Sequence, residues 1–198
     1  LFRSHVLVKF SEPDAGPVGE RWRDLLLAEH LALETLREAG VPAATTRLID
    51  TAGQRFLEVE RFDRAGALGR RAVFSLSALD AEFVGAGGSN WPAIARRLVA
   101  ARVIVPQAAE SAALLWAFGT LIGNTDMHGG NLSFLSEQGP PCEIAPAYDM
   151  SPMGFAPRGG GGLPDALGDA AIDAGVANAT WRQAEALARA YLARLVTG

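Results

Sequence analysis

The hydrophobic positions in the first third of the chain predict a small antiparallel sheet with one helix. Residues 5–10 have an alternating pattern and are rich in β-branched side chains, which is typical of a strand. Residues 20–39 repeat apolar side chains at spacings of three and four, which predicts a helix. Residues 46–50 and 54–61 predict two further strands, joined by a tight Ala-Gly turn.

The rest of the chain has a mainly helical pattern. The sequence therefore predicts an α+β fold in two lobes, a small antiparallel sheet lobe over residues 1–70 and a mainly helical lobe over 71–198, with the boundary near residues 64–75. The predicted elements of the second lobe are a helix from Asn90 to about Val103, a helix over 107–122, short strands at 132–135 and 143–145, and a helix from a capping box at Thr180 to about Val196.

Composition and charge narrow the classes of function. Of the 198 residues 49% are hydrophobic and 20% are charged, and the formal net charge of -4 gives no basic excess, so we expect no direct binding to nucleic acid. Cys142 is the only cysteine, which together with the lack of a signal peptide favours a cytosolic setting. No apolar run is long enough to cross a membrane. Because the chain begins at Leu1, directly before a strand, we expect its natural start to lie upstream.

A polar loop after the apolar helix has the residues of a phosphoryl-transfer site. Residues 123–131 read Gly-Asn-Thr-Asp-Met-His-Gly-Gly-Asn, and Asp149 follows after a predicted hairpin. Protein kinases use an Asp, an Asn and a second Asp in this order, the first to receive a hydroxyl proton and the others to bind metal. Each residue alone is also a common loop cap. The order of all three favours Asp126 as the catalytic base and Asn131 and Asp149 as Mg²⁺ ligands.

Lys9 and Glu29 are predicted to form an ion pair. Lys9 shares a strand face with Leu7, so this face is at least partly covered. A lysine in such a position can bind nucleotide phosphates if a carboxylate holds it in place. Glu29 falls within the apolar stripe of its predicted helix, where a carboxylate is costly to bury unless it is paired. The alternative is that both side chains are solvated.

Three further residues are candidates for nucleotide binding. Glu60 and Phe62 end the predicted hairpin at the lobe boundary, where backbone groups would meet the adenine edge and the Phe62 ring would pack on it. A solvated strand end fits that spacing equally well. His128 has three possible roles: a hydrogen bond that shapes the loop, a phosphate contact, or metal binding. The first is favoured, and a transition-metal site is disfavoured because no other His or Cys is suitably spaced.

Four motifs resemble the HipA family, whose members are serine/threonine protein kinases and the toxins of bacterial toxin–antitoxin pairs. The motifs are Leu7-Val8-Lys9-Phe10, residues 59–64, residues 122–133, and Pro146-Ala147-Tyr148-Asp149-Met150-Ser151.

The resemblance implies a two-lobed protein-kinase-like fold that uses ATP and Mg²⁺. It implies Lys9 as the nucleotide lysine, Glu60 and Phe62 as the hinge, Asp126 as the catalytic residue, and Asn131 and Asp149 as metal ligands. It also implies a protein substrate and a small DNA-binding antitoxin as partner. The chain departs from the family in two ways: the family's phosphate-covering loop would lie before Leu1, and the region after Asp149 is short and Gly-rich.

Two other functions remain open. Small-molecule kinases of the aminoglycoside or choline type have the same Asp, Asn and Asp order, but usually with His before the first Asp, where this chain has Asn124-Thr125. A non-catalytic module that only docks an antitoxin or another partner is the alternative from a different class.

Overall fold

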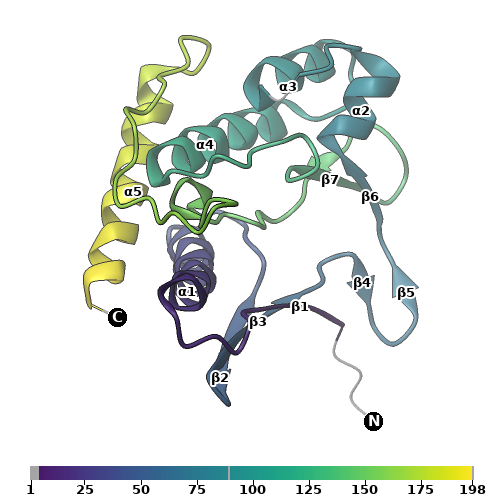
Figure 1. Ribbon diagram of the computed structural model, residues 1–198. Helices are drawn as coiled ribbons and strands as arrows, with labels where there is room; N and C mark the ends of the chain where they lie inside the picture. Colours follow the sequence, from purple (N-terminus) through teal and green to yellow (C-terminus); the bar gives the residue numbers. More distant parts are fainter. Residues whose placement is uncertain (1–4, 89, 198) are drawn as a thin grey trace.

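The computed structural model describes residues 5–88 and 90–197 and has the predicted α+β architecture (Figure 1). Its elements are β1 (Val6–Phe10), α1 (Pro17–Glu38), β2 (Thr46–Thr51), β3 (Gln54–Glu60), β4 (Arg64–Ala65), β5 (Gly69–Arg70), β6 (Ala72–Ser75), α2 (Leu76–Phe83), α3 (Trp91–Ala100), α4 (Pro106–Ile122), β7 (Ser133–Ser136), β8 (Glu143–Ile144), the 3₁₀ helix η1 (Met153–Phe155) and α5 (Asn178–Thr197). No helix in this described part is long and apolar enough to span a membrane.

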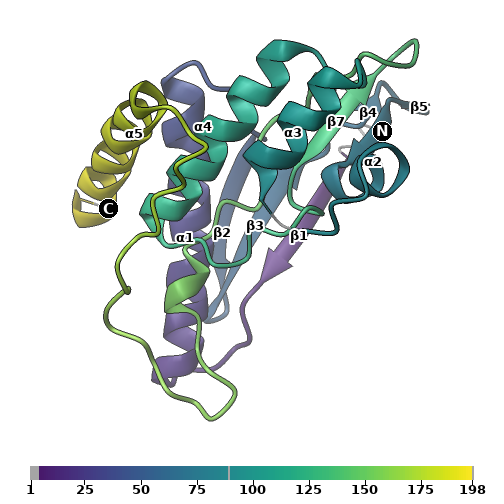
Figure 2. The ribbon, with the colours of Figure 1, turned by 90° about the horizontal axis from the view of Figure 1, so that it is seen from above.

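The first three strands form an antiparallel sheet in the order β1-β3-β2, with α1 packed against one face (Figure 2). Lys9 pairs with Leu57 of β3, so the two side chains share a face of the sheet. Leu57 is fully buried, whereas Val8 and Phe10, on the opposite face, are exposed. The prediction that Lys9 lies on the covered face is therefore confirmed.

The segment between the predicted lobes has structure that the sequence pattern did not indicate. Strands β4 and β5 form a short hairpin, and β6 pairs with β7 in a second three-stranded sheet of order β6-β7-β8. Strands β4, β5 and β6 have two to four residues each, which is too short for alternation to be recognised, whereas β7 and β8 correspond to the strands predicted at 132–135 and 143–145. The division at residues 70 and 71 stays a prediction.

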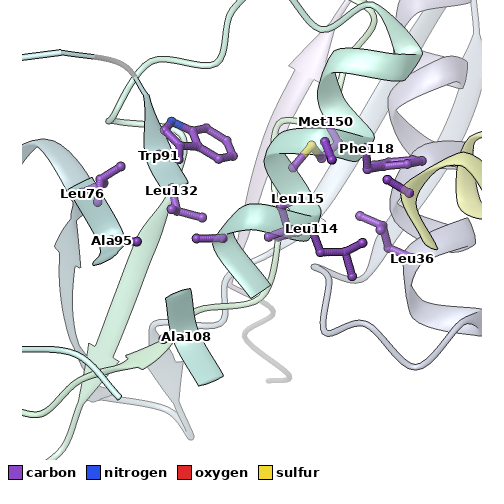
Figure 3. Close-up of a cluster of buried hydrophobic side chains, with 14 of the residues drawn as sticks. Leu36, Leu76, Trp91, Ala95, Ala108, Leu114, Leu115, Phe118, Leu132 and Met150 are labelled. Carbon is purple, nitrogen blue, oxygen red and sulfur yellow. The ribbon is translucent and has the colours of Figure 1, made fainter. Parts of the chain in front are cut away.

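One hydrophobic core joins α1 to the helical part of the chain. Helix α4 packs against both α3 and α5, which confirms its predicted central position. Figure 3 shows Phe118 and Leu115 of α4 in a buried cluster together with Leu36 of α1, Trp91 of α3 and Met150. Because Leu36 belongs to the same cluster, α1 is fixed to the helices as well as to the sheet.

Two predicted helix boundaries were wrong. Helix α3 ends at Ala100, and Arg102 has a left-handed backbone with φ of 58°, which stops the helix before Val103. Helix α5 begins at Asn178, and the amide of Trp181 already bonds to the carbonyl of residue 177. Thr180 therefore lies inside the first turn and does not cap the helix.

Candidate active site

Lys9 lies between two carboxylates that come from distant parts of the chain. Its Nζ is 2.8 and 2.9 Å from the two oxygens of Glu29 and also donates to Oδ1 of Asp149. The Glu29 side chain is only 3% exposed and that of Asp149 is 34% exposed. The predicted ion pair between Lys9 and Glu29 is confirmed, and Asp149 completes a group of three that we call the Lys9 triad.

Burial and charge act in opposite directions on the pKa values of this triad. Burial alone would lower the pKa of Lys9, but the attraction of Glu29 and Asp149 outweighs it, and the pKa lies above its ordinary value. Burial raises the pKa of Glu29, and the nearby ammonium of Lys9 offsets only part of that increase. The lysine therefore stays protonated, and the triad has one more carboxylate than it has cations.

The triad lies in a cavity of about 410 Å³, a size suited to a small ligand. The rings of Phe62 and Tyr148 lie 5.8 Å apart, centroid to centroid, and form part of its wall. Five predicted site residues thus line one cavity. Its lining residues are Leu7, Lys9, Glu29, Val59, Glu60, Arg61, Phe62, Asp63, Val73, Ser133, Tyr148 and Asp149.

The backbone at the predicted hinge has a distinct pattern of hydrogen bonds. The amide of Glu60 donates to the carbonyl of Thr45 at 2.8 Å, and that of Arg61 donates to the carbonyl of His5 at 2.9 Å. The amide of Phe62 has no hydrogen-bond partner among the described residues. In the segment that starts at Glu60, the first backbone amide available to a ligand is therefore that of Phe62, which lines the cavity.

Asp126 has a fixed backbone and an open side chain. Gly123 ends α4 with φ of 79°, a left-handed conformation that favours glycine, and the chain then turns into the loop. The amide of Asp126 donates to Oδ1 of Asn124 at 3.0 Å, and its carbonyl accepts from Nδ2 of Asn131 at 2.9 Å. The carboxylate of Asp126 is 56% exposed. Two asparagines thus hold the peptide groups of a residue whose carboxylate faces outward.

His128 shapes this loop and lies outside the cavity of the Lys9 triad. Its Nδ1 accepts from the amide of Gly130 at 3.0 Å, and its carbonyl accepts from Nε1 of Trp91 at 3.2 Å. Its Nε2 is 4.0 Å from Oδ1 of Asp126, and the two residues line a separate cavity beside Trp116. These contacts favour the structural role of His128, while a nucleotide contact stays a prediction.

Tyr148 connects the two halves of the site, and sequence reasoning assigned it no role. Its hydroxyl donates to the carbonyl of Gly130 at 2.6 Å and is 2.7 Å from Oγ of Ser133. Burial raises the pKa of Tyr148, so the hydroxyl keeps its proton. The hairpin therefore folds back on the loop, as expected. The available signal was a tyrosine, one of only two, directly before Asp149.

The oxygen donors present suit Mg²⁺. Asp149 offers a carboxylate, and Asn131 offers an amide whose nitrogen is already bonded to the carbonyl of Asp126 and whose oxygen accepts no hydrogen bond from a described residue. Mg²⁺ commonly binds one or two protein carboxylates together with waters and substrate phosphates. Within residues 5–88 and 90–197, no three His, Cys, Asp or Glu side chains are placed to hold a metal by themselves. In their chemistry, a carboxylate and an amide oxygen are donors that Mg²⁺ takes when it is shared with a phosphate.

The segment after Asp149 is attached to α1. Nη1 of Arg21 donates to the carbonyl of Phe155 at 2.9 Å and to that of Pro164 at 2.7 Å. Further along, Leu167 packs close to Gly123 and Gly154. The Gly-rich region between these contacts is therefore attached at both ends to elements that carry site residues.

Comparisons with known proteins agree on one family. The family model of the HipA-like C-terminal domain matches residues 2–196. Toxin YjjJ of Escherichia coli (strain K12) is 44% identical over 189 residues, which are 94% of this chain and 42% of that protein. The chain thus spans less than half the length of this relative.

Two solved structures share the fold. HipA of Shewanella oneidensis MR-1, solved in a complex with HipB and its operator DNA, aligns with a TM-score of 0.54 and 24% identity over 74% of this chain and 37% of that one. The Helicobacter pylori proinflammatory kinase CtkA aligns with a TM-score of 0.57 and 18% identity over 75% of this chain and 51% of that one. These neighbours confirm the predicted kinase-like fold. The match over nearly the whole chain and the 44% identity to a toxin show that this protein belongs to the HipA-like C-terminal domain family.

Proposed function

We propose that this chain is the nucleotide-binding and catalytic part of an ATP- and Mg²⁺-dependent serine/threonine protein kinase of the HipA toxin type. The observation that carries the proposal is Lys9, which is paired with buried Glu29 and bonded to Asp149 inside a cavity with aromatic and apolar walls. Family membership supports the toxin type, and a structural neighbour that is named a kinase supports the class of reaction.

Each site residue has a role in this proposal. Lys9 binds the α- and β-phosphates, and the free amide of Phe62 donates to the adenine edge. Asn131 and Asp149 hold Mg²⁺, which neutralises charge on the phosphates when bound. Asp126 orients the acceptor hydroxyl and takes its proton, a contribution of roughly 10²- to 10⁴-fold.

The position of Asp126 supports a macromolecular phosphoacceptor. Its carboxylate is 56% exposed and lies outside the cavity that holds Lys9. A nucleotide in that cavity and a serine or threonine on a protein surface can therefore approach from different sides. We further propose a small DNA-binding antitoxin as partner, because the HipA neighbour was solved with HipB and operator DNA.

Phosphate transfer by the full-length protein tests the proposal. Radiolabelled ATP and Mg²⁺ are supplied with lysate proteins, and wild type is compared with Asp126→Asn and with Asp169→Asn, an exposed carboxylate changed in the same way. We expect Asp126→Asn to lose transfer by about 10²-fold or more while it keeps its ATP affinity in calorimetry. Asp169→Asn should resemble wild type.

The other outcomes separate the alternatives. Wild-type transfer by Asp126→Asn would remove Asp126 from catalysis. Labelling of aminoglycosides in place of proteins would indicate a small-molecule kinase. A full-length protein that captures an antitoxin but binds no ATP in the presence of Mg²⁺ would be a non-catalytic module.

A further inference from the structure

Asn124 bridges the two acidic residues of the site through their backbones. It is 4% exposed, and both polar atoms of its side chain are used. Oδ1 accepts from the amide of Asp126 at 3.0 Å, and Nδ2 donates to the carbonyl of Asp149 at 3.3 Å. The side-chain amide of Asn124 therefore links its own loop to Asp149, which lies 25 residues later in the chain.

We propose that Asn124 is a positioning residue that holds the proton-accepting Asp126 and the metal-binding Asp149 in a fixed relation. This inference rests on the proposed function of those two residues. Asn124 itself touches neither nucleotide nor acceptor; it acts through the two peptide groups.

Both peptide groups need such support. Asp149 has φ of 57°, a left-handed conformation that is uncommon for a non-glycine residue and is more stable when its surroundings support it. The bond from Asn124 reaches the carbonyl of this strained residue. The exposed carboxylate of Asp126 has its direction set mainly by its backbone, since no described residue donates a hydrogen bond to it and the ring nitrogen Nε2 of His128 is 4.0 Å from its Oδ1. A shift of the Asp126 amide would therefore re-aim the carboxylate.

The bridge is anchored on a rigid element. The amide of Asn124 donates to the carbonyl of Gly119 at 2.9 Å, so the residue continues from the buried end of α4. The carbonyl of Gly123 accepts from the amide of Gly154 at 2.8 Å, which ties the segment after Asp149 to the same helix end. Placing site residues from a packed helix gives a more precise geometry than a free loop would.

Two substitutions distinguish the two halves of the bridge. Asn124→Asp has nearly the same shape and keeps an oxygen for the Asp126 amide, but it loses the donor and turns an oxygen toward the carbonyl of Asp149. Asn124→Ala loses both bonds. Asn178→Asp, at the exposed start of α5, is the matched control for the chemical change.

Amide hydrogen exchange of the full-length protein tests whether the Asn124 bridge exists, and it does not depend on catalytic activity. In Asn124→Asp we expect faster exchange of the hydrogen-bonded amides that flank Asp149, those of Ala147 and Gly154, while the amide of Asp126 stays protected. In Asn124→Ala we expect faster exchange at both places, and in Asn178→Asp at neither. Wild-type exchange of the Ala147 and Gly154 amides in both Asn124 variants would overturn the bridge, whatever the protein is found to catalyse.

Kinetics then test the positioning role. We expect both Asn124 variants to lower kcat by about tenfold or more, because small misplacements of reacting groups are costly, while KM for ATP changes by less than about threefold. An unchanged kcat in Asn124→Asp would overturn the positioning role of Asn124. Equal losses in kcat and ATP affinity, together with a lower melting temperature, would also overturn it. If the wild type transfers no phosphate, the proposed function fails, and the exchange experiment still decides whether the bridge exists.

Discussion

At the scale of single residues, Lys9 stands out because it is the only lysine in a sequence whose other long basic side chains are all arginines. An ammonium is a compact charge with three donors, whereas a guanidinium is planar and needs a matching flat partner. Lys9 serves two oxygens of Glu29 and one of Asp149 at once. The geometry at this position thus suits the one basic residue type that the rest of the chain does not use.

Removing either member of the buried pair should weaken nucleotide binding. We expect Lys9→Ala and Lys9→Arg to lower the ATP affinity of the full-length protein by about tenfold or more, which is about 1.4 kcal/mol. Glu29→Ala should have a similar effect, and the double variant with Lys9→Ala should lose less than the sum, since both residues serve one ion pair. Calorimetry measures this, with exposed Arg47→Ala as the control. Unchanged affinity in Lys9→Ala would contradict the assignment.

The raised pKa of Lys9 predicts slow acylation of its amine. A raised pKa means less free amine at any pH below 10.5, so wild-type Lys9 should react more slowly with an amine reagent near pH 9 than in Glu29→Gln or Asp149→Asn. Because the folded protein favours protonated Lys9, the contribution of Lys9 to the free energy of unfolding is fully present below pH 10.5. It is lost as the pH rises further, through the raised pKa. Mass spectrometry of the peptide that contains Lys9 gives the rates. Faster labelling in wild type than in both variants would refute the prediction.

At the scale of elements, the end of α4 is the most constrained junction near the site. Gly123 has φ of 79°, and a Cβ added there would lie 2.5 Å from Cδ1 of Leu167. Gly123→Ala should therefore destabilise the protein by about 1–2 kcal/mol from the backbone alone, with a further cost from the clash. Chemical unfolding measures the loss.

Two comparisons check the cause. Gly160→Ala, where an added Cβ has nothing within 4 Å, should unfold like wild type. Adding Leu167→Ala to Gly123→Ala should remove the clash and leave the backbone cost. A double variant that is no more stable than Gly123→Ala would show that Leu167 does not cause the clash.

Local signals explain which elements and site residues were predictable. The β2–β3 hairpin was predicted from two strand-like runs joined at Ala52 and Gly53, and in the structure both turn residues take the positive φ of such a turn. The cap of α3 was predicted because asparagine is a preferred N-cap residue, and Asn90 does accept from the amide of Ala93. The Lys9–Glu29 pair followed from the cost of burying a lone carboxylate.

The rest depends on tertiary contacts. Strand β6 exists because it pairs with β7, which lies some sixty residues later in the chain. The sequence assigned Asn124 no role, because its second bond goes to a residue beyond the hairpin. The capping pattern at Thr180 failed because such a sequence also fits inside a helix that begins one turn earlier. No pattern confined to one segment reports these relations.

At the scale of the whole molecule, the sheet and the helices share a core. Leu33 and Leu36 of α1 are fully buried in the same cluster as Phe118 of α4 and Tyr191 of α5. We therefore expect the chain to unfold in one transition, with tryptophan fluorescence and circular dichroism giving the same midpoint. Two separate transitions would show that the predicted lobes are independent, in contrast to the shared core.

Helix α1 also connects two distant contacts. Arg21 donates hydrogen bonds to the segment after Asp149, and Glu29 accepts from Lys9. Both residues belong to α1, where they lie about 12 Å apart along the helix axis. A tilt of α1 would displace the contacts of Arg21 and of Glu29 together. The segment that contains the Gly-rich stretch and the ammonium of Lys9 are therefore both held by side chains of one helix.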